Sequence, residues 1–99
     1  MKLLTKAVEQ ALPPLYSQEG NPDPLVRVHY FNPLGAGDWF ITEGEWQDDE
    51  FLMFGLCDLG YPELGYVLLS EMMSVRLKLG MGIERDLNWR VKPLSEVCA

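Results

Sequence analysis

Lysine and arginine are absent from nearly half of this chain. Between Val28 and Val75 there is no basic residue, although eight occur in the 99-residue sequence. The same window holds nine carboxylates, which are Asp38, Glu43, Glu45, Asp48, Asp49, Glu50, Asp58, Glu63 and Glu71. The whole chain has a formal net charge of −7, so this window is more negative than the molecule. Such a segregated charge can steer or repel a charged surface from one side, which makes a charged partner the first hypothesis.

Histidine, cysteine and long apolar runs are also scarce. One histidine, His29, and two cysteines without paired spacing do not predict a structural zinc site. We interpret Cys57 and Cys98 as free thiols, because the N-terminal residues lack the apolar run of a signal peptide. No stretch approaches the roughly 18 apolar residues that a membrane span needs. We therefore expect a cytoplasmic protein that does not enter a membrane.

No catalytic, metal-binding or nucleotide-binding motif is evident. Gly35 and Gly37 resemble the start of a dinucleotide fingerprint, but Phe40 stands in place of the third glycine and no helix is predicted to follow. We therefore expect no cofactor. Hydrophobic residues make up 47% of the sequence, which is enough to bury a core without a metal or a disulfide. Residues 1–99 are predicted to form a single domain.

Apolar periodicity predicts a helix near the N-terminus, with clear signals at both ends. Thr5 is a suitable N-cap, and Pro13 with Pro14 should end the helix near Ala11 or Leu12. Further patterns predict strands at 25–31, 39–43, 51–57 and 66–69, a helix at 70–79, and a last strand at 87–91. The order α-β-β-β-β-α-β indicates an α+β fold, with a single mostly antiparallel sheet of about five strands and two helices packed on one face.

The acidic segment between the second and third predicted strands has the most functional content. Residues 44–50 should form a long, charged hairpin loop. The candidate partner-binding residues in and beside it are Glu43, Glu45, Trp46, Asp48, Asp49 and Glu50. One interpretation is a solvated loop that keeps the protein soluble, as most charge runs do. The other is a contact site, in which Trp46 has a side chain enriched in interface hot spots and is ringed by carboxylates that suit a basic partner.

Three other side chains could serve an enzyme. His29 is predicted on the solvated face of its strand, and a proton-transfer role would require an oriented partner. Arg76 either lies at the C-terminus of the second helix, where carbonyl groups favour a cation, or turns inward to meet a carboxylate. Arg85 is similarly placed to pair, and Glu63 and Glu71 are candidate partners for both arginines. We favour structural roles for the arginines; the alternative is a small enzyme, or an enzyme subunit, whose cleft contains His29, Arg76 or Arg85.

Several short segments, spread over nearly the whole chain, form a specific set. They are Leu3-Leu4-Thr5-Lys6, Leu12-Pro13-Pro14-Leu15-Tyr16, Phe54-Gly55, Glu63-Leu64-Gly65-Tyr66, Leu69-Ser70-Glu71, Val75-Arg76, Ile83-Glu84-Arg85-Asp86-Leu87 and Lys92-Pro93-Leu94-Ser95-Glu96. Together they resemble a family of small bacterial proteins of unknown function, carried by plasmids, phages and integrative elements. The sequence departs from the family pattern after Arg76, where it is more apolar. The resemblance implies a genetic context, and neither an activity nor catalytic residues.

These observations predict a non-enzymatic, acidic binding protein that docks on a basic protein surface. Small acidic proteins of mobile elements often resemble, in charge, inhibitors that occupy the DNA-binding surface of host defence enzymes, because carboxylates can stand in for phosphates at a basic groove. The resemblance thus implies a host nuclease, or another nucleic-acid enzyme, as the most specific partner. Direct nucleic-acid binding is not expected at a pI of ≈ 4.5.

Overall fold

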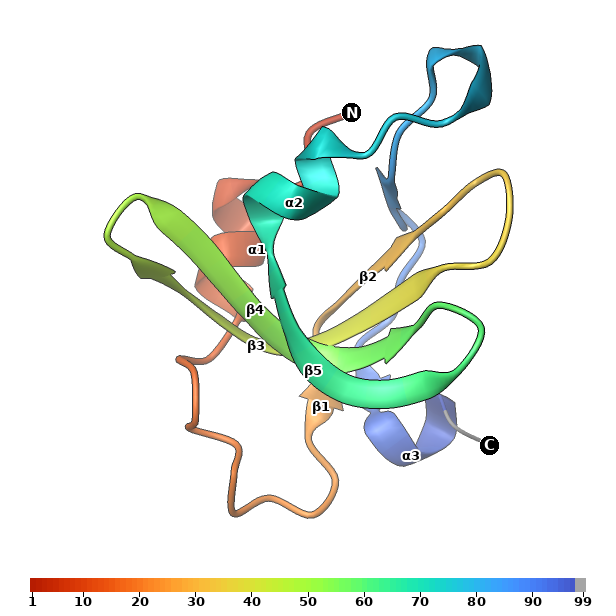
Figure 1. Ribbon diagram of the computed structural model, residues 1–99. Helices are drawn as coiled ribbons and strands as arrows, with labels where there is room; N and C mark the ends of the chain where they lie inside the picture. The colour runs from red at the N-terminus through yellow and green to blue at the C-terminus, as the bar shows by residue number, and fades with distance from the viewer. Residues whose placement is uncertain (98–99) are drawn as a thin grey trace.

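The computed structural model describes residues 1–97, and its centre is an antiparallel sheet of five strands (Figure 1). In chain order these strands are β2 (Val28–Phe31), β3 (Asp38–Gln47), β4 (Glu50–Asp58), β5 (Pro62–Leu68) and β6 (Glu84–Arg85). Across the sheet their order is β5-β4-β3-β2-β6. A separate two-stranded sheet pairs β1 (Leu25–Val26) with β7 (Lys92–Pro93). The predicted α+β class and the antiparallel sheet of five strands are confirmed. The prediction of a single sheet in the order α-β-β-β-β-α-β is wrong, because β1 and β7 pair with each other apart from the main sheet.

Three short helices flank the main sheet. They are α1 (Lys6–Ala11), α2 (Leu69–Ser74) and α3 (Leu94–Val97), and a 3-10 turn, η1 (Lys78–Gly80), follows α2. Helices α1 and α2 lie on one side of the sheet and α3 lies on the other (Figure 1). The expectation of two helices missed α3, which has only four residues and therefore no periodicity to read.

The core lies between the sheet and the side on which α1 and α2 pack. Strand alternation in β2 turns Val28 and Tyr30 toward this side, where they meet Ile41 of β3 and Met53 of β4. Around them pack residues from the N-terminal segment, the helices and the β5–β6 connection, which are Leu3, Leu12, Leu69, Met72 and Ile83. Each such side chain contributes about 1.5–3 kcal/mol when it is fully buried, so this cluster supplies the main driving force for folding.

The first helix has the limits that the sequence predicts. The hydroxyl of Thr5 accepts a hydrogen bond from the Val8 amide, and Leu12 has left the helical conformation with a ψ of 124°. Pro13 enforces this end, because proline disfavours a helical conformation at the residue before it.

The second helix is shorter than predicted. It ends at Ser74, and Val75 already has an extended conformation. Leu79 lies in the 3-10 turn with a φ of 63° and is 92% exposed, so the predicted helix at 70–79 is wrong beyond Ser74. The glycines that follow Leu79 favour a turn, and this local preference prevails over the apolar spacing.

The predicted strand at 87–91 is also absent. The backbone turns at Asp86, whose carboxylate accepts a hydrogen bond from the Asn88 amide at 2.9 Å while its carbonyl accepts one from the Trp89 amide at 3.3 Å. Such an Asx turn satisfies locally the amide groups that a strand would direct to a neighbour. The apolar alternation of Leu87, Trp89 and Val91 therefore reflects a loop that lays Trp89 against the sheet and leaves Leu87 66% exposed.

The predicted strands at 25–31 and 66–69 also differ in their limits. The predicted strand 25–31 is divided at Arg27, whose amide donates to the Ile41 carbonyl at 2.9 Å, so that β1 pairs with β7 and β2 stays in the main sheet. The strand predicted at 66–69 begins earlier, at Pro62, because its residues continue the β4 ladder as far as Asp58.

Candidate functional site

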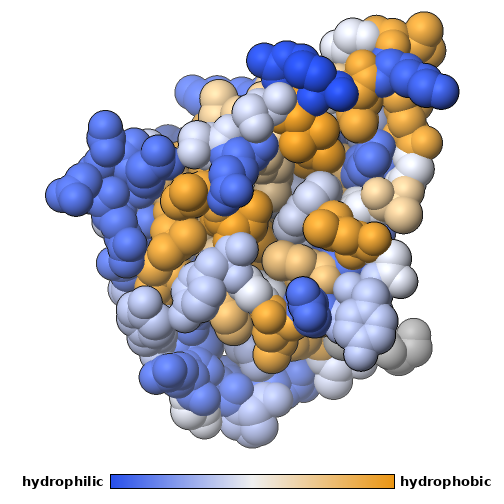
Figure 2. Space-filling view, viewed as in Figure 1, coloured by the Kyte–Doolittle hydropathy of each residue, from blue (hydrophilic) through white to orange (hydrophobic). Residues whose placement is uncertain are grey.

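The β3–β4 hairpin carries the residues that the sequence singled out. The two strands pair as far as Gln47 and Glu50, so that only Asp48 and Asp49 form the turn. Asp48 has a φ of 58°, a left-handed conformation that aspartate adopts more readily than most residues. The expected long loop at 44–50 is therefore wrong. It is instead a paired ribbon that projects from the body of the molecule, and Figure 2 shows a hydrophilic surface over its end.

Trp46 is held on this ribbon and remains half exposed. It lies directly across from Phe51, with ring centroids 5.3 Å apart and planes at 72°, the edge-to-face geometry that aromatic pairs prefer. Its indole Nε1 donates to Oε1 of Glu9 on α1 at 2.8 Å. The ring is thus fixed on one side and at its polar edge, while the residue remains 47% exposed to solvent. We call Trp46, Asp48, Asp49 and Glu50 the acidic hairpin end.

Glu43 and Glu45 are used inside the fold. Glu43 is only 4% exposed; its Oε1 accepts from the Tyr16 amide at 3.0 Å and its Oε2 from the Gln18 amide at 2.8 Å. Glu45 accepts from the Leu15 amide at 2.8 Å. Both carboxylates therefore hold the segment after α1 against the part of β3 that β2 does not cover.

A bulge in β3 explains why Glu43 turns toward that segment. The β3–β4 register shifts between Ile41 and Glu43, so Glu43 lies across from Phe54 rather than continuing the alternation that buries Ile41. Sequence reasoning missed this because a bulge leaves no regular pattern and because the bonded amides lie 25 to 30 residues away.

The exposed carboxylates of the hairpin have no cationic partner. Within residues 1–97, which include every lysine and arginine of the chain, no ion pair joins one of these residues to a carboxylate. Both salt bridges of the described part involve His29. The negative potential of the acidic hairpin end is therefore not neutralised by contacts within the molecule.

The two arginines singled out by the sequence bind backbone carbonyls. Arg76 donates through one guanidinium nitrogen to the carbonyls of Met73 at 2.8 Å and Val75 at 3.1 Å, which confirms the interpretation as a cation at a helix C-terminus. Arg85 donates from Nε to the Lys2 carbonyl at 3.3 Å. The alternative in which Arg76 turns inward to a carboxylate is wrong, and so is the pairing of Arg85, because within residues 1–97 neither arginine forms a salt bridge.

His29 is not on a solvated face. Its side chain is 14% exposed and its ring stacks on Phe40 with centroids 4.6 Å apart and planes at 6°. Trp89 packs against both rings, with its centroid 5.3 Å from that of His29 and 5.9 Å from that of Phe40. The face of β2 that we expected to meet solvent is covered by the loop after β6, a long-range contact that strand alternation cannot reveal.

Both ring nitrogens of His29 meet carboxylates. Nε2 lies 2.7 Å from Asp38 and Nδ1 lies 2.9 Å from Asp86. A neutral imidazole can donate only one of these two bonds, so both form together when the ring is doubly protonated or when one carboxyl holds the proton. The hydrogen bond from His29 lowers the pKa of Asp86. The triad joins β2, the start of β3 and the loop after β6, so it fixes the C-terminal segment on the sheet.

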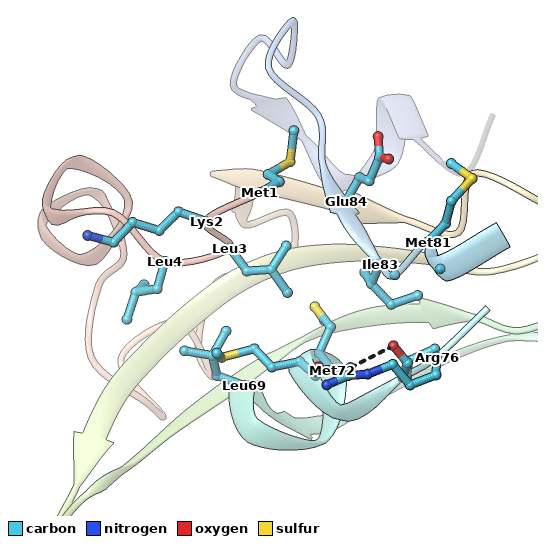
Figure 3. A pocket seen from close by; sticks show the side chains of 14 residues that line it. Met1, Lys2, Leu3, Leu4, Leu69, Met72, Arg76, Met81, Ile83 and Glu84 are labelled. Carbon is cyan, nitrogen blue, oxygen red and sulfur yellow. Dashed lines mark hydrogen bonds between the residues drawn. The ribbon is translucent and has the colours of Figure 1, made fainter. Parts of the chain in front are cut away.

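Two of the grooves on the surface of residues 1–97 are lined by residues that the sequence singled out, Arg76 in one and Glu43 in the other. The first, of about 540 Å³, lies between the N-terminal segment, α2 and the residues before β6. Figure 3 shows Leu3 and Ile83 pointing toward α2, with Met72 and Arg76 on the opposite side. Arg76 lines this groove, whereas His29 and Arg85 line neither of the two. The three side chains of the enzyme alternative are therefore not brought together in one cleft.

The second groove was not anticipated from the sequence. It encloses about 260 Å³ between the segment after α1 and the middle of β3, β4 and β5. Aromatic and acidic side chains line it together, among them Tyr16, Phe54, Tyr66, Glu19 and Glu43. The nearest signal in the sequence is the tyrosine in each of two of its distinctive segments, but nothing there indicates that the two rings meet.

Other reactive groups give no further site. Cys57 is a free thiol, as expected, and burial followed by the charge of Glu63 raises its pKa; Cys98 lies outside the described residues. Among residues 1–97, no three His, Cys, Asp or Glu side chains converge as metal ligands would. In the same part of the chain, every helix is too short or too polar to cross a membrane.

Comparison with known proteins gives one match. Residues 2–98 match DUF2958, a family described as protein of unknown function. No curated protein and no solved structure matches the chain. Because the match extends over almost every residue, from the segment before α1 to α3, the chain belongs to the DUF2958 family.

Proposed function

We propose that this protein is a non-enzymatic binding protein whose acidic hairpin end docks on a basic protein surface. The observation that carries the proposal is the absence, within residues 1–97, of any lysine or arginine paired with the carboxylates of the hairpin. A complementary cationic surface would supply the missing partners and would be attracted from a distance. Trp46 adds an aromatic anchor that is already fixed before binding, which limits the entropy lost on association.

The most specific partner is a nuclease or another nucleic-acid enzyme of a bacterial host, met in the cytoplasm by a protein that a mobile element carries. The hairpin supports this version because it presents consecutive carboxylates, Asp48, Asp49 and Glu50, at the end of a narrow ribbon. A ribbon of this kind can enter a groove that normally binds the phosphates of a nucleic acid. Its carboxylates would take the place of those phosphates.

The test compares two triple variants that lose the same charge. The variant of the hairpin is Asp48→Asn with Asp49→Asn and Glu50→Gln, and the control is Glu63→Gln with Glu84→Gln and Glu96→Gln. Each protein is used to capture partners from the host at low salt, and each captured partner is then purified. Its affinity is measured at about 50 and about 200 mM salt.

We expect the hairpin variant to bind its partner roughly tenfold more weakly at low salt, because three exposed charges each contribute about 0.5 kcal/mol. The control should bind as the wild type does. We also expect wild-type affinity to fall steeply with salt. Equal binding by the hairpin variant, or an affinity that does not change with salt, would contradict the proposal.

A further inference from the structure

The second groove combines an aromatic wall with acidic groups. Phe54 and Tyr66 have ring centroids 4.8 Å apart and planes at 56°, and Tyr16 and Tyr66 have centroids 6.3 Å apart and planes at 58°. The tilted rings line a hollow of about 260 Å³ rather than filling it. Tyr16 is 55% exposed and Tyr66 is 51% exposed, so both rings keep a surface that is open to a ligand.

The charges around this hollow have one sign. Glu43 and Glu19 line it, and none of its lining residues is a lysine, arginine or histidine. Glu43 is buried, and its carboxylate receives its hydrogen bonds from backbone amides, without a cation among the described residues. The negative potential also acts on the neighbouring phenol: burial raises the pKa of Tyr66, and Tyr16, Glu43 and Glu19 raise it further.

The backbone at Tyr16 is in an uncommon conformation. Its φ is 69°, a left-handed region that bulky side chains rarely occupy. The hydrogen bond from the Tyr16 amide to Glu43 holds it there. Burial of the Tyr16 side chain does not explain this backbone conformation, since the residue is half exposed. Unusual backbone conformations of this kind gather at ligand-binding sites, where the surrounding structure maintains them.

We propose that this groove binds the guanidinium group of an arginine side chain from the basic partner. The inference rests on the proposed function and adds to it a second contact, about five residues along β3 from the hairpin turn, or roughly 16 Å at the rise of a strand. Aromatic faces attract cations, and they do so more strongly beside carboxylates that water cannot fully screen. Arginine suits the site better than lysine because its planar group stacks on rings and is more weakly hydrated.

The experiment uses a small probe so that it does not depend on knowing the partner. N-acetyl-arginine amide is titrated into the wild-type protein, and the ring signals of tyrosine and phenylalanine are followed by NMR. N-acetyl-citrulline amide is the matched probe, because it has nearly the same shape and no charge. We expect saturable shifts at Tyr16, Phe54 and Tyr66 with the arginine probe, and at most slight shifts with the citrulline probe.

Three variants locate the binding. Tyr66→Leu should lower the affinity for the arginine probe by roughly fivefold or more, and Glu19→Gln should lower it by about twofold. Tyr61→Leu is the control, because Tyr61 is 76% exposed and does not line the groove. Equal shifts with the two probes would overturn the inference, and so would unchanged binding by both Tyr66→Leu and Glu19→Gln.

The outcome can be separated from that of the proposed function. The triple variant of the acidic hairpin end keeps every residue that lines the groove, so it should bind the arginine probe as the wild type does. If the arginine probe binds but no partner docks on the acidic hairpin end, the proposed function is contradicted and the groove is still a site for a guanidinium group. A salt-sensitive partner whose affinity is unchanged in Tyr66→Leu would support the docking hairpin and overturn the role of the groove.

Discussion

Replacement of the buried carboxylate Glu43 by glutamine should destabilise the protein without changing its shape. The two side chains have nearly the same volume, so the packing around residue 43 is kept. What changes is one oxygen atom. In the wild type, the two oxygens accept separate hydrogen bonds from the amides of Tyr16 and Gln18, at 3.0 and 2.8 Å. Glutamine keeps one acceptor and places an NH₂ group against the second amide, where neither group can accept.

The magnitude follows from the loss of one charge-assisted hydrogen bond. Such a bond contributes about 1.5–3 kcal/mol, and the amide left without an acceptor lies in a part-buried contact. Burying a neutral amide costs less free energy than burying a carboxylate, and this difference offsets part of the loss. We expect the free energy of unfolding to fall by about 2 kcal/mol. For a domain of this size the midpoint of thermal unfolding should decrease by roughly 8–16 °C.

Urea unfolding followed by circular dichroism measures this change. Glu45→Gln is the matched control: Glu45 accepts a single bond, from the Leu15 amide, and the glutamine oxygen can still accept it. That variant should lose less than about 1 kcal/mol. Amide hydrogen exchange at Tyr16 and Gln18 should accelerate only in Glu43→Gln. If the two variants unfold at the same urea concentration, the carboxylate does not hold the segment after α1 in the way we describe.

Three further predictions concern other positions. Gly55→Ala should lower the free energy of unfolding, measured in urea, by roughly 2–3 kcal/mol, because the new Cβ would overlap a carbonyl oxygen of β3. The control is Gly65→Ala, which lies directly across the β4–β5 ladder and has open space for a Cβ, so its free energy of unfolding should stay within about 0.5 kcal/mol of the wild type. Burial raises the pKa of Tyr30 to about 12 from its ordinary 10.0, so wild-type stability should fall by roughly 2–3 kcal/mol between these two pH values, and Tyr30→Phe should abolish that fall. The bond from His29 lowers the pKa of Asp86 below 3.8, so Asp86→Asn should destabilise at about pH 6 and differ little from the wild type at about pH 2, as acid unfolding curves would show.

Local chemistry made some of the fold predictable. The helix α1 begins at Thr5 and ends before Pro13 because a hydroxyl cap and a proline act on their immediate neighbours. The strand β4 was predicted at 51–57 and runs from Glu50 to Asp58, whereas β3 was predicted only at 39–43 and continues to Gln47. Where an element depends on contacts within a few residues, its sequence contains the necessary information.

The remaining elements depend on distant contacts. The strand β6 has two residues and exists because Arg85 and Glu84 pair with β2 more than fifty positions earlier in the chain. The burial of His29 depends on Trp89, which reaches the sheet only after the turn at Asp86. No short stretch of sequence contains both partners of such a contact, so the spacing of apolar residues along the chain cannot predict it.

The candidate site was likewise predictable only where it depends on neighbouring residues in the sequence. The sequence identified Trp46 and the acidic residues beside it, and the structure places Asp48, Asp49 and Glu50 at an exposed end. It could not show that Glu43 is buried, because that depends on a bulge and on amides of a distant segment. The aromatic groove was missed for a similar reason, since Tyr16 lies far from both Phe54 and Tyr66 in the sequence.

The base-free window therefore does not act as a single acidic surface. Glu43 and Glu45 hold backbone amides, and Asp38 holds His29, so these carboxylates stabilise the fold. Neutralising the whole window would remove these contacts together with the exposed charges, and a loss of partner binding could then result from unfolding. Only Asp48, Asp49 and Glu50 combine high exposure with a place at the end of the hairpin. A change confined to them tests docking, whereas a change at Glu43 tests stability, and the two effects should appear in different assays.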